Sequence, residues 1–245
     1  MAAEFENKLI VVTGAAGGIG QECVSLFLEA GAELLLIDPN ADALKQFQKS
    51  LNAGDRVKIH VSKIASPEAC AKALDGRPGP IYGFVHLAGT FVADDLTPDN
   101  RTDVYDPVIA SNLTNAYDMA IACIPRFDPD QLCRIVLTSS LAFRRGASDH
   151  TAYSAAKGGI AGLARSLSRR LAPHVLVNAL APGLIDTAMP KEFIAENHDR
   201  LLAGIPLGRF GHAREVATVI EFLCSDGASY MTGQMLNVDG GIVAG

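Results

Sequence analysis

Leu9-Ile-Val-Val-Thr13, followed directly by Gly14-Ala-Ala-Gly-Gly-Ile-Gly20, is the stretch that decides the fold of this chain. The first part is short, apolar and rich in β-branched residues, which predicts a parallel strand buried on both faces. The second part is a glycine turn, and the run 21–30 behind it predicts a helix. A strand, a glycine turn and a helix in this order are typical of a dinucleotide-binding unit, because glycines let the backbone approach a pyrophosphate at the start of the helix. A purely structural glycine turn is the weaker alternative.

An acidic residue ends the second predicted strand, which covers residues 33–37. Asp38 lies eighteen residues after Gly20. A carboxylate at this place can accept hydrogen bonds from both ribose hydroxyls of an adenosine and repels a 2′-phosphate. Pro39 and Asn40 follow it, so no Arg or Lys stands beside it to receive such a phosphate. The pattern favours NAD as the cofactor over NADP, and Asp38 could also cap the next helix.

Strands and helices continue to alternate along the rest of the chain. Further strands are expected at 57–61, 81–87, 134–138, 175–180 and 234–238, and further helices at 42–51, 67–74, 108–124, 151–171, 191–203 and 213–224. This pattern predicts an α/β fold: a single-domain, Rossmann-type, doubly wound, seven-stranded parallel sheet with helices on both faces, spanning residues 1–245. Residues 189–211 are expected to form a lid over the substrate. Because the connections run right-handed, the carboxyl ends of strands one, four, five and six should meet at one edge, which would carry Gly14, Ala88, Ser140 and Pro182.

Composition narrows the classes of protein that fit. The 245 residues are 49% hydrophobic and 20% charged, with a net charge of -6 and scattered basic residues, which disfavours nucleic-acid binding. The five cysteines are an odd number, far apart and without a Cys-x-x-Cys pair, as in a protein with reduced thiols. The six histidines show no metal-ligand spacing, so no metal is expected. Neither a secretory signal nor a membrane-length apolar run is visible, and we expect a cytoplasmic protein without a membrane partner.

Two polar residues share one face of the predicted helix 151–171. Tyr153 and Lys157 are four positions apart, which places a phenol beside an ammonium. A free tyrosine has a pKa of about 10, and a nearby cation favours the phenolate and lowers that pKa towards the working range. Ser140 follows the apolar run 135–138, at the end of a strand, where open α/β sheets bind ligands. A Tyr-x-x-x-Lys spacing alone would suggest only a surface tyrosine and a solvated lysine; its weight here comes from the glycine turn in the first half of the chain.

These motifs, in this order, resemble those of the classical short-chain dehydrogenases/reductases over essentially the whole chain. Residues 13–20 match the family's Thr-Gly-x-x-x-Gly-x-Gly, and Ser140 with Tyr153 and Lys157 matches its catalytic serine and Tyr-x-x-x-Lys. Asn112, within Ser111-Asn-Leu113, matches the family's helix asparagine. Residues 178–183, with Thr187 beyond them, match its motif after strand six, and the segments 205–211 and 232–241 resemble its tail.

The resemblance implies a role for each matching residue. Tyr153 would be the general acid/base, and Lys157 would lower its pKa and hold the nicotinamide ribose. Ser140 would steady the substrate oxygen, and Asn112 would organise a water relay to Lys157. The residues expected to bind the cofactor are Gly14, Gly17, Gly18, Ile19, Gly20, Asp38, Val61, Ala88, Gly89, Tyr153, Lys157, Pro182, Gly183, Ile185 and Thr187. The resemblance also implies a homotetramer.

The chain departs from the family pattern at two places. His86-Leu-Ala-Gly89 stands where Asn-Asn-Ala-Gly is usual, and His60-Val61 stands where Asp-Val often binds the adenine. His86 is expected to pack or bond locally rather than to act in catalysis. The adenine contact would then fall to the backbone of Val61 or to His60.

Three functions remain open at this point. The first is an NAD-dependent alcohol dehydrogenase or carbonyl reductase that transfers hydride between a nicotinamide and a secondary alcohol/ketone pair. The second is a 3-oxoacyl thioester (acyl-carrier-protein) reductase, although such enzymes usually use NADPH, which Asp38 opposes. The third is a non-catalytic NAD-binding sensor or scaffold, which would not need a tuned phenol. The substrate depends on the loops 91–106, 141–150 and 189–204, where Arg144 or Arg145 could meet an anionic substrate or be solvated surface charges.

Overall fold

A parallel sheet runs through the centre of the molecule, in a computed structural model that describes residues 4–189 and 191–243. The ends of the predicted domain 1–245, and Pro190 in the predicted lid 189–211, lie outside the described residues. Within them, seven strands follow the order β3-β2-β1-β4-β5-β6-β9, and every neighbouring pair is parallel. The strands are β1 (Leu9–Thr13), β2 (Glu33–Asp38), β3 (Val57–Val61), β4 (Gly83–His86), β5 (Cys133–Thr138), β6 (Val175–Pro182) and β9 (Met235–Val238). The predicted doubly wound, seven-stranded sheet is confirmed.

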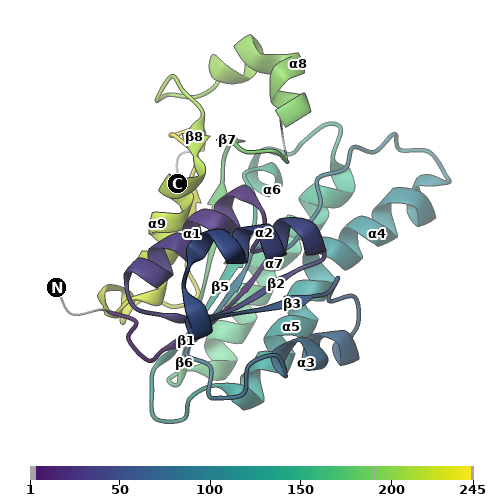
Figure 1. Ribbon diagram of the computed structural model, residues 1–245. Coiled ribbons are helices and arrows are strands. Elements are labelled where there is room, and N and C mark those ends of the chain that lie inside the picture. Colours follow the sequence, from purple (N-terminus) through teal and green to yellow (C-terminus); the bar gives the residue numbers. More distant parts are fainter. Residues whose placement is uncertain (1–3, 190, 244–245) are drawn as a thin grey trace.

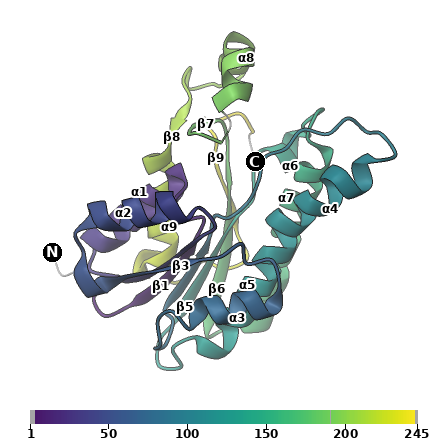
Figure 2. The ribbon, with the colours of Figure 1, turned by 45° about the vertical axis from the view of Figure 1, so that its right-hand side comes forward.

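Helices cover both faces of this sheet. Figure 2 shows α1 (Gly18–Glu29), α2 (Ala41–Leu51) and α9 (Ala213–Cys224) on one side, and α3 (Pro67–Leu74), α5 (Asn115–Cys123) and α7 (Thr151–Leu171) on the other. Each side has its own apolar core: one cluster contains Phe27, Leu44 and Ile220, and the other contains Met119 and Ile160. All five residues of β1 are buried, as a strand covered on both faces requires.

The segment between β4 and β5 is more helical than its sequence indicates. It was expected to be mainly loop from 91 to 106, but helical backbone begins at Arg101 and continues through Arg101–Tyr105, α4 (Asp106–Ile109), Ala110–Thr114 and α5. The stretches Arg101–Tyr105 and Ala110–Thr114 are π-helical, and the N–H of Asn115 donates to the carbonyl of Ala110, five residues back. Pro107 lies just after the first π-helical stretch, inside this continuous helical run.

Smaller elements gather above the carboxyl edge of the sheet. They are α6 (Ala142–Arg145), which falls in the expected loop 141–150, and the two-stranded pair β7 (Ile185–Asp186) and β8 (Gly211–His212). Helix α8 (Lys191–Leu202) stands above them at the top of the view (Figure 1), with non-helical backbone at Asn197. Short 3₁₀ turns occur at Gly54–Arg56, Ile124–Arg126 and Asp226–Ala228. In the part of the chain that the structure describes, no helix is long and apolar enough to cross a membrane.

Candidate active site

The glycine turn links the end of β1 to the start of α1. Gly14 has φ +68°, a left-handed conformation that glycine adopts at little cost, and this lets the chain reverse directly after Thr13. Gly17 then precedes the first turn of α1, without a side-chain cap. No partner for the backbone N–H groups of Gly18, Ile19 and Gly20 is found in the described part of the chain. These unpaired donors, at the positive end of a helix, fit the pyrophosphate of a dinucleotide.

Thr187 packs directly against this turn. A Cβ added to Gly18 would lie 2.9 Å from the Thr187 methyl carbon, so a larger residue there would displace Thr187. Thr187 follows β7, and the small sheet of β7 and β8 holds this segment beside α1. The residues present therefore fit the cofactor that the sequence predicts.

Asp38 is held against the same turn. Its Oδ2 accepts a hydrogen bond from the N–H of Ala16 at 3.1 Å, and its Oδ1 accepts one from Asn40 at 2.9 Å. The carboxylate has further lone pairs for ribose hydroxyls. The idea that Asp38 caps the next helix is wrong, because Asn40 is the residue that caps α2, through its Oδ1 and the N–H of Ala43. Val61 ends β3 opposite Asp38 in register and is 43% exposed.

Tyr153 and Lys157 lie in the first turns of α7, both buried, with the Lys157 Nζ 5.5 Å from the centre of the Tyr153 ring. Burial raises the pKa of Tyr153, and a hydrogen bond with the Ser140 side chain opposes this. The prediction that Lys157 lowers the pKa of Tyr153 is therefore not met in this structure. Burial also lowers the pKa of Lys157 to about 8, and its Nζ donates to the Thr138 carbonyl at 3.0 Å.

The end of β5 supplies hydroxyls to this arrangement. The Oγ of Ser140 accepts the N–H of Ala142 at 3.1 Å, and its side chain also forms a hydrogen bond with that of Tyr153. The neighbouring Ser139, which sequence analysis did not single out, donates to the carbonyl of Lys157 at 2.6 Å. Ser139 therefore fixes α7 to the end of β5, and the only sequence signal for it is its position beside Ser140.

Asn112 is fully buried in the π-helical turn Ala110–Thr114. Its Nδ2 donates to the carbonyls of Thr90 and Val108, both at 3.0 Å, and its Oδ1 accepts the N–H of Thr90 at 3.3 Å. A Cβ on Gly89 would overlap with this Oδ1 and would lie 3.4 Å from the Lys157 Nζ. Asn112 and Lys157 thus approach Gly89 from two sides, and the side chain of Asn112 fixes the segment after β4.

His86 bonds locally, as expected. Its Nδ1 and the Thr13 Oγ1 are 2.9 Å apart, so the side chain connects β4 to β1 just below the glycine turn. Its ring is fully buried and packs against Phe84 at 5.8 Å between ring centres. Burial, together with the charge of Lys157, lowers the pKa of His86 to about 3. His86 is therefore uncharged near neutral pH.

One cavity of about 540 Å³ joins these groups at the carboxyl edge of the sheet. It is lined by all four candidate catalytic residues and by most of the predicted cofactor-binding residues: Gly14, Gly17, Gly18, Ile19, Gly20, Gly89, Pro182, Gly183, Ile185 and Thr187. Asp38, Val61 and Ala88 do not line it. Asp38 and Val61 lie at the ends of β2 and β3, beyond the glycine turn, where the adenosine of a dinucleotide would lie.

An aromatic wall at the other end of the cavity was not predicted. Phe91 stacks on His150 at 3.9 Å between ring centres, and Phe193 of α8 meets both rings edge-on. Phe91 also meets the Tyr153 ring edge-on at 5.1 Å. These residues come from three separate segments, so no spacing in the sequence could bring them together.

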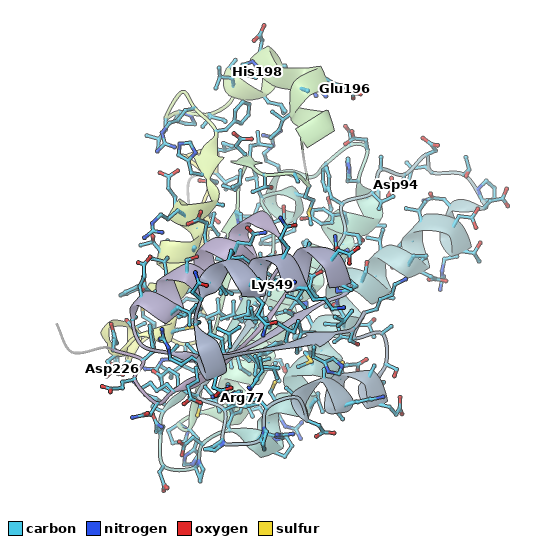
Figure 3. The ribbon with its side chains drawn as sticks, in the orientation of Figure 1. Lys49, Arg77, Asp94, Glu196, His198 and Asp226 are labelled. Atoms are coloured by element: carbon cyan, nitrogen blue, oxygen red, sulfur yellow. The ribbon has the colours of Figure 1, made fainter. Side chains whose placement is uncertain are left out.

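Asp94 is a second residue that the sequence gave no reason to select. Its Oδ2 accepts the N–H of Ala152 at 2.8 Å and so caps the helix that carries Tyr153. Figure 3 shows Asp94 in the upper half of the molecule, below Glu196 and His198 of α8.

Comparison with known proteins agrees with this geometry. Residues 14–243 match the family model described as enoyl-(acyl carrier protein) reductase. The chain is 33% identical to the 3-oxoacyl-[acyl-carrier-protein] reductase FabG of Vibrio harveyi, over 97% of this chain and 98% of the relative. It is 34% identical to the FabG of Chlamydia trachomatis, over 99% and 100% of the two chains.

Solved structures also resemble this chain. The crystal structure of the short-chain dehydrogenase/reductase described as glucose/ribitol dehydrogenase from Brucella melitensis has a TM-score of 0.95 and 35% identity, over 100% of both chains. From the family match, these relatives and the shared fold, the chain belongs to the short-chain dehydrogenase/reductase family of nicotinamide-dependent oxidoreductases.

Proposed function

We propose that this protein is an NAD(H)-dependent dehydrogenase/reductase that interconverts a secondary alcohol and a ketone, with Tyr153 as the general acid/base. The observation that carries the proposal is the single cavity in which Tyr153, Ser140 and Lys157 meet the glycine turn. A non-catalytic NAD-binding protein would have no use for this set of donors around a buried phenol.

Tyr153 and Ser140 act on the oxygen of the reacting carbonyl. The nicotinamide, when bound, supplies the hydride. Because burial raises the pKa of Tyr153, its phenol keeps its proton near neutral pH and is ready to donate it to the oxygen of a ketone. Ser140, whose hydroxyl forms a hydrogen bond with Tyr153, would donate to the same oxygen once a ketone is bound, and donors aimed at a developing negative charge stabilise the transition state.

Lys157 and Asn112 would act on the cofactor side. The Lys157 ammonium has three protons and donates one to Thr138, which leaves two for the hydroxyls of the nicotinamide ribose. The two protons of the Asn112 amide are directed to Thr90 and Val108, so a water relay would have to start from the remaining lone pair of Oδ1. We propose that Asn112 mainly fixes the Thr90 segment, so that Gly89 leaves space beside Lys157.

The choice of NAD rests on Asp38. Its carboxylate contacts the glycine turn through Ala16, and no Arg or Lys forms an ion pair with it among the described side chains. A 2′-phosphate placed there would meet a negative charge without a compensating cation.

A 3-oxoacyl-[acyl-carrier-protein] reductase is the second candidate, because the relatives at 33 and 34% identity carry that name. The two candidates share the reaction at the carbonyl and differ in the group attached to it.

The test is a panel of ketones, alcohols and 3-oxoacyl thioesters followed by NADH absorbance, with NADPH in parallel. We expect turnover with NADH that exceeds turnover with NADPH, and weaker NADH binding by Asp38→Ala. Tyr153→Phe should lose turnover and still bind NADH. Equal or better turnover with NADPH would contradict the role of Asp38, and an active Tyr153→Phe variant would contradict the role of the phenol.

We also propose that the protein is a cytoplasmic homotetramer. Tyr117 and Ile121, one turn apart on α5, are 50% and 42% exposed, which fits a helix face that packs against a second subunit. Light scattering after size-exclusion chromatography measures the mass directly, and a monomer of 25.8 kDa would contradict the proposal.

A further inference from the structure

The end of the cavity away from the glycine turn has its own chemistry. Phe91, His150 and Phe193 form an aromatic wall there, next to the phenol of Tyr153. The Nδ1 of His150 and the Oδ1 of Asp149 are 2.9 Å apart. Since an ionised carboxylate only accepts hydrogen bonds, Nδ1 carries the proton of this pair. The phenyl rings of Phe91 and Phe193 suit the carbon skeleton of a substrate and carry no charge for an ionic group.

Two arginines that are exposed to solvent also line this cavity. Arg145, at the end of α6, and Arg200, on α8, both line it. Neither guanidinium forms an ion pair with a carboxylate among the side chains of residues 4–189 and 193–243. Arg200 donates to the Oδ1 of Asn197 at 2.7 Å, which leaves most of its five N–H donors unused.

One carboxylate lies near these two charges among the described lining residues. Asp149 is the acid among the described lining residues, and its Oδ1 is already paired with His150. The charge of Arg200 helps to lower the pKa of Asp149, behind the stronger effect of the His150 hydrogen bond. Glu196 lies on α8 as well, but it is exposed and does not line the cavity (Figure 3). Among the described residues that line the cavity, Arg145, Lys157 and Arg200 outnumber Asp149, so the lining is positively charged although the chain has a net charge of -6.

We propose that Arg145 and Arg200 bind a carboxylate of the substrate, so that the protein acts on a small oxo acid and its hydroxy acid. The planar guanidinium binds a carboxylate through paired hydrogen bonds. The carbon chain then lies along Phe91 and Phe193, and the ketone oxygen faces Tyr153.

This inference rests on the proposed function, and its reaction balances. A hydride passes from NADH to the ketone carbon, a proton passes from Tyr153 to the oxygen, Tyr153 takes up a proton from solvent, and the products are NAD⁺ and the hydroxy acid. The carboxylate takes no part in the chemistry and sets only which ketone is bound. A thioester in its place would present a neutral group to the two arginines.

The test compares three forms of one carbon skeleton: an oxo acid of four to six carbons, its methyl ester and its N-acetylcysteamine thioester. Wild-type protein is expected to favour the acid by at least about tenfold in kcat/KM, since a charge-assisted hydrogen bond contributes about 1.5–3 kcal/mol. Arg145→Ala and Arg200→Ala should lower the acid-to-ester ratio by roughly tenfold to 100-fold, mainly through KM. Arg145→Lys should keep part of the preference because it keeps the charge. Lys49→Ala, on the exposed face of α2 and outside the cavity, is the matched control for loss of one positive charge and should not change the ratio.

Calorimetric titration of the acid and of the ester into the NADH complex separates this inference from the proposed function. Tighter binding of the acid that is lost in Arg145→Ala supports the carboxylate site even if none of the compounds turns over, an outcome that would contradict only the proposed reaction. The inference is overturned if the acid binds no more tightly than the ester. It is equally overturned if both arginine variants keep the wild-type ratio. A preference for the neutral thioester over the oxo acid would also overturn the inference, and so would a preference for a phosphorylated ketone, because the two arginines would then not select a carboxylate.

Discussion

Replacing Lys157 by methionine should make the protein more stable while it abolishes turnover. The pKa of Lys157 is lowered from 10.5 to about 8 because the ammonium is buried. Each pKa unit corresponds to about 1.4 kcal/mol, so keeping this group charged in the folded protein costs about 3 kcal/mol below pH 8. Methionine has a similar length and no charge, and it removes this cost. It also removes the hydrogen bond to the Thr138 carbonyl, which contributes about 1 kcal/mol. The net gain of about 2 kcal/mol should raise Tm by about 4–8 °C for a chain of this size.

The pH dependence tests the cause of this gain. Between pH 8 and pH 10.5 the unfolded chain holds the Lys157 proton and the folded chain releases it, so the wild-type protein becomes more stable relative to the variant as pH rises. At pH 9.5 the remaining cost of the charge is about 1 kcal/mol, which the lost hydrogen bond offsets, and the two Tm values should converge. Calorimetry at pH 7 and pH 9.5 without cofactor measures both effects, with Lys49→Met on the exposed face of α2 as the control. A variant that melts no higher than wild type at pH 7, or whose advantage persists at pH 9.5, would refute the reasoning.

Three further substitutions test the packing around the site by thermal unfolding. Gly89→Ala would place its Cβ on the Asn112 Oδ1, so it should destabilise the protein by about 1–3 kcal/mol and reduce activity; unchanged Tm would show that Asn112 can move aside. Gly162→Ala, in α7 with nothing within 4 Å of its Cβ, should instead stabilise by up to about 1 kcal/mol, and a loss of stability would mean that this helix face is covered. Asp94→Ala removes the carboxylate that accepts the N–H of Ala152, so it should lower Tm by about 2–4 °C for a loss of about 1 kcal/mol, whereas Asp94→Asn should retain most of the stability.

Most of the fold was predictable because its signals are local. The predicted bounds of the helices Pro67–Leu74, Thr151–Leu171 and Ala213–Cys224 agree with the structure, since each contains an uninterrupted helical pattern. The segment from Arg101 to Thr114 was harder, because π-helical turns leave no pattern in the sequence and the side chain of Asn112 bonds to Thr90, 22 residues earlier in the chain. The pair of β7 and β8 joins residues 185–186 to 211–212, and two-residue strands leave no pattern in a sequence.

The candidate site likewise combines features that the sequence predicts with features that only the folded chain shows. Spacing along the chain was enough to place Tyr153 and Lys157 on one turn of a helix, and the order of strand, glycine turn and helix was enough to predict a dinucleotide. Only the tertiary structure decided the pKa values of these two groups. Both side chains are buried, so burial raises the pKa of Tyr153 and lowers the pKa of Lys157. Only the folded chain brings Phe91, His150 and Phe193 together, with Arg145 and Arg200 lining the same cavity. A sequence records which side chains are near one another along a helix or strand, whereas the environment of a charge depends on contacts between segments that are far apart in the chain.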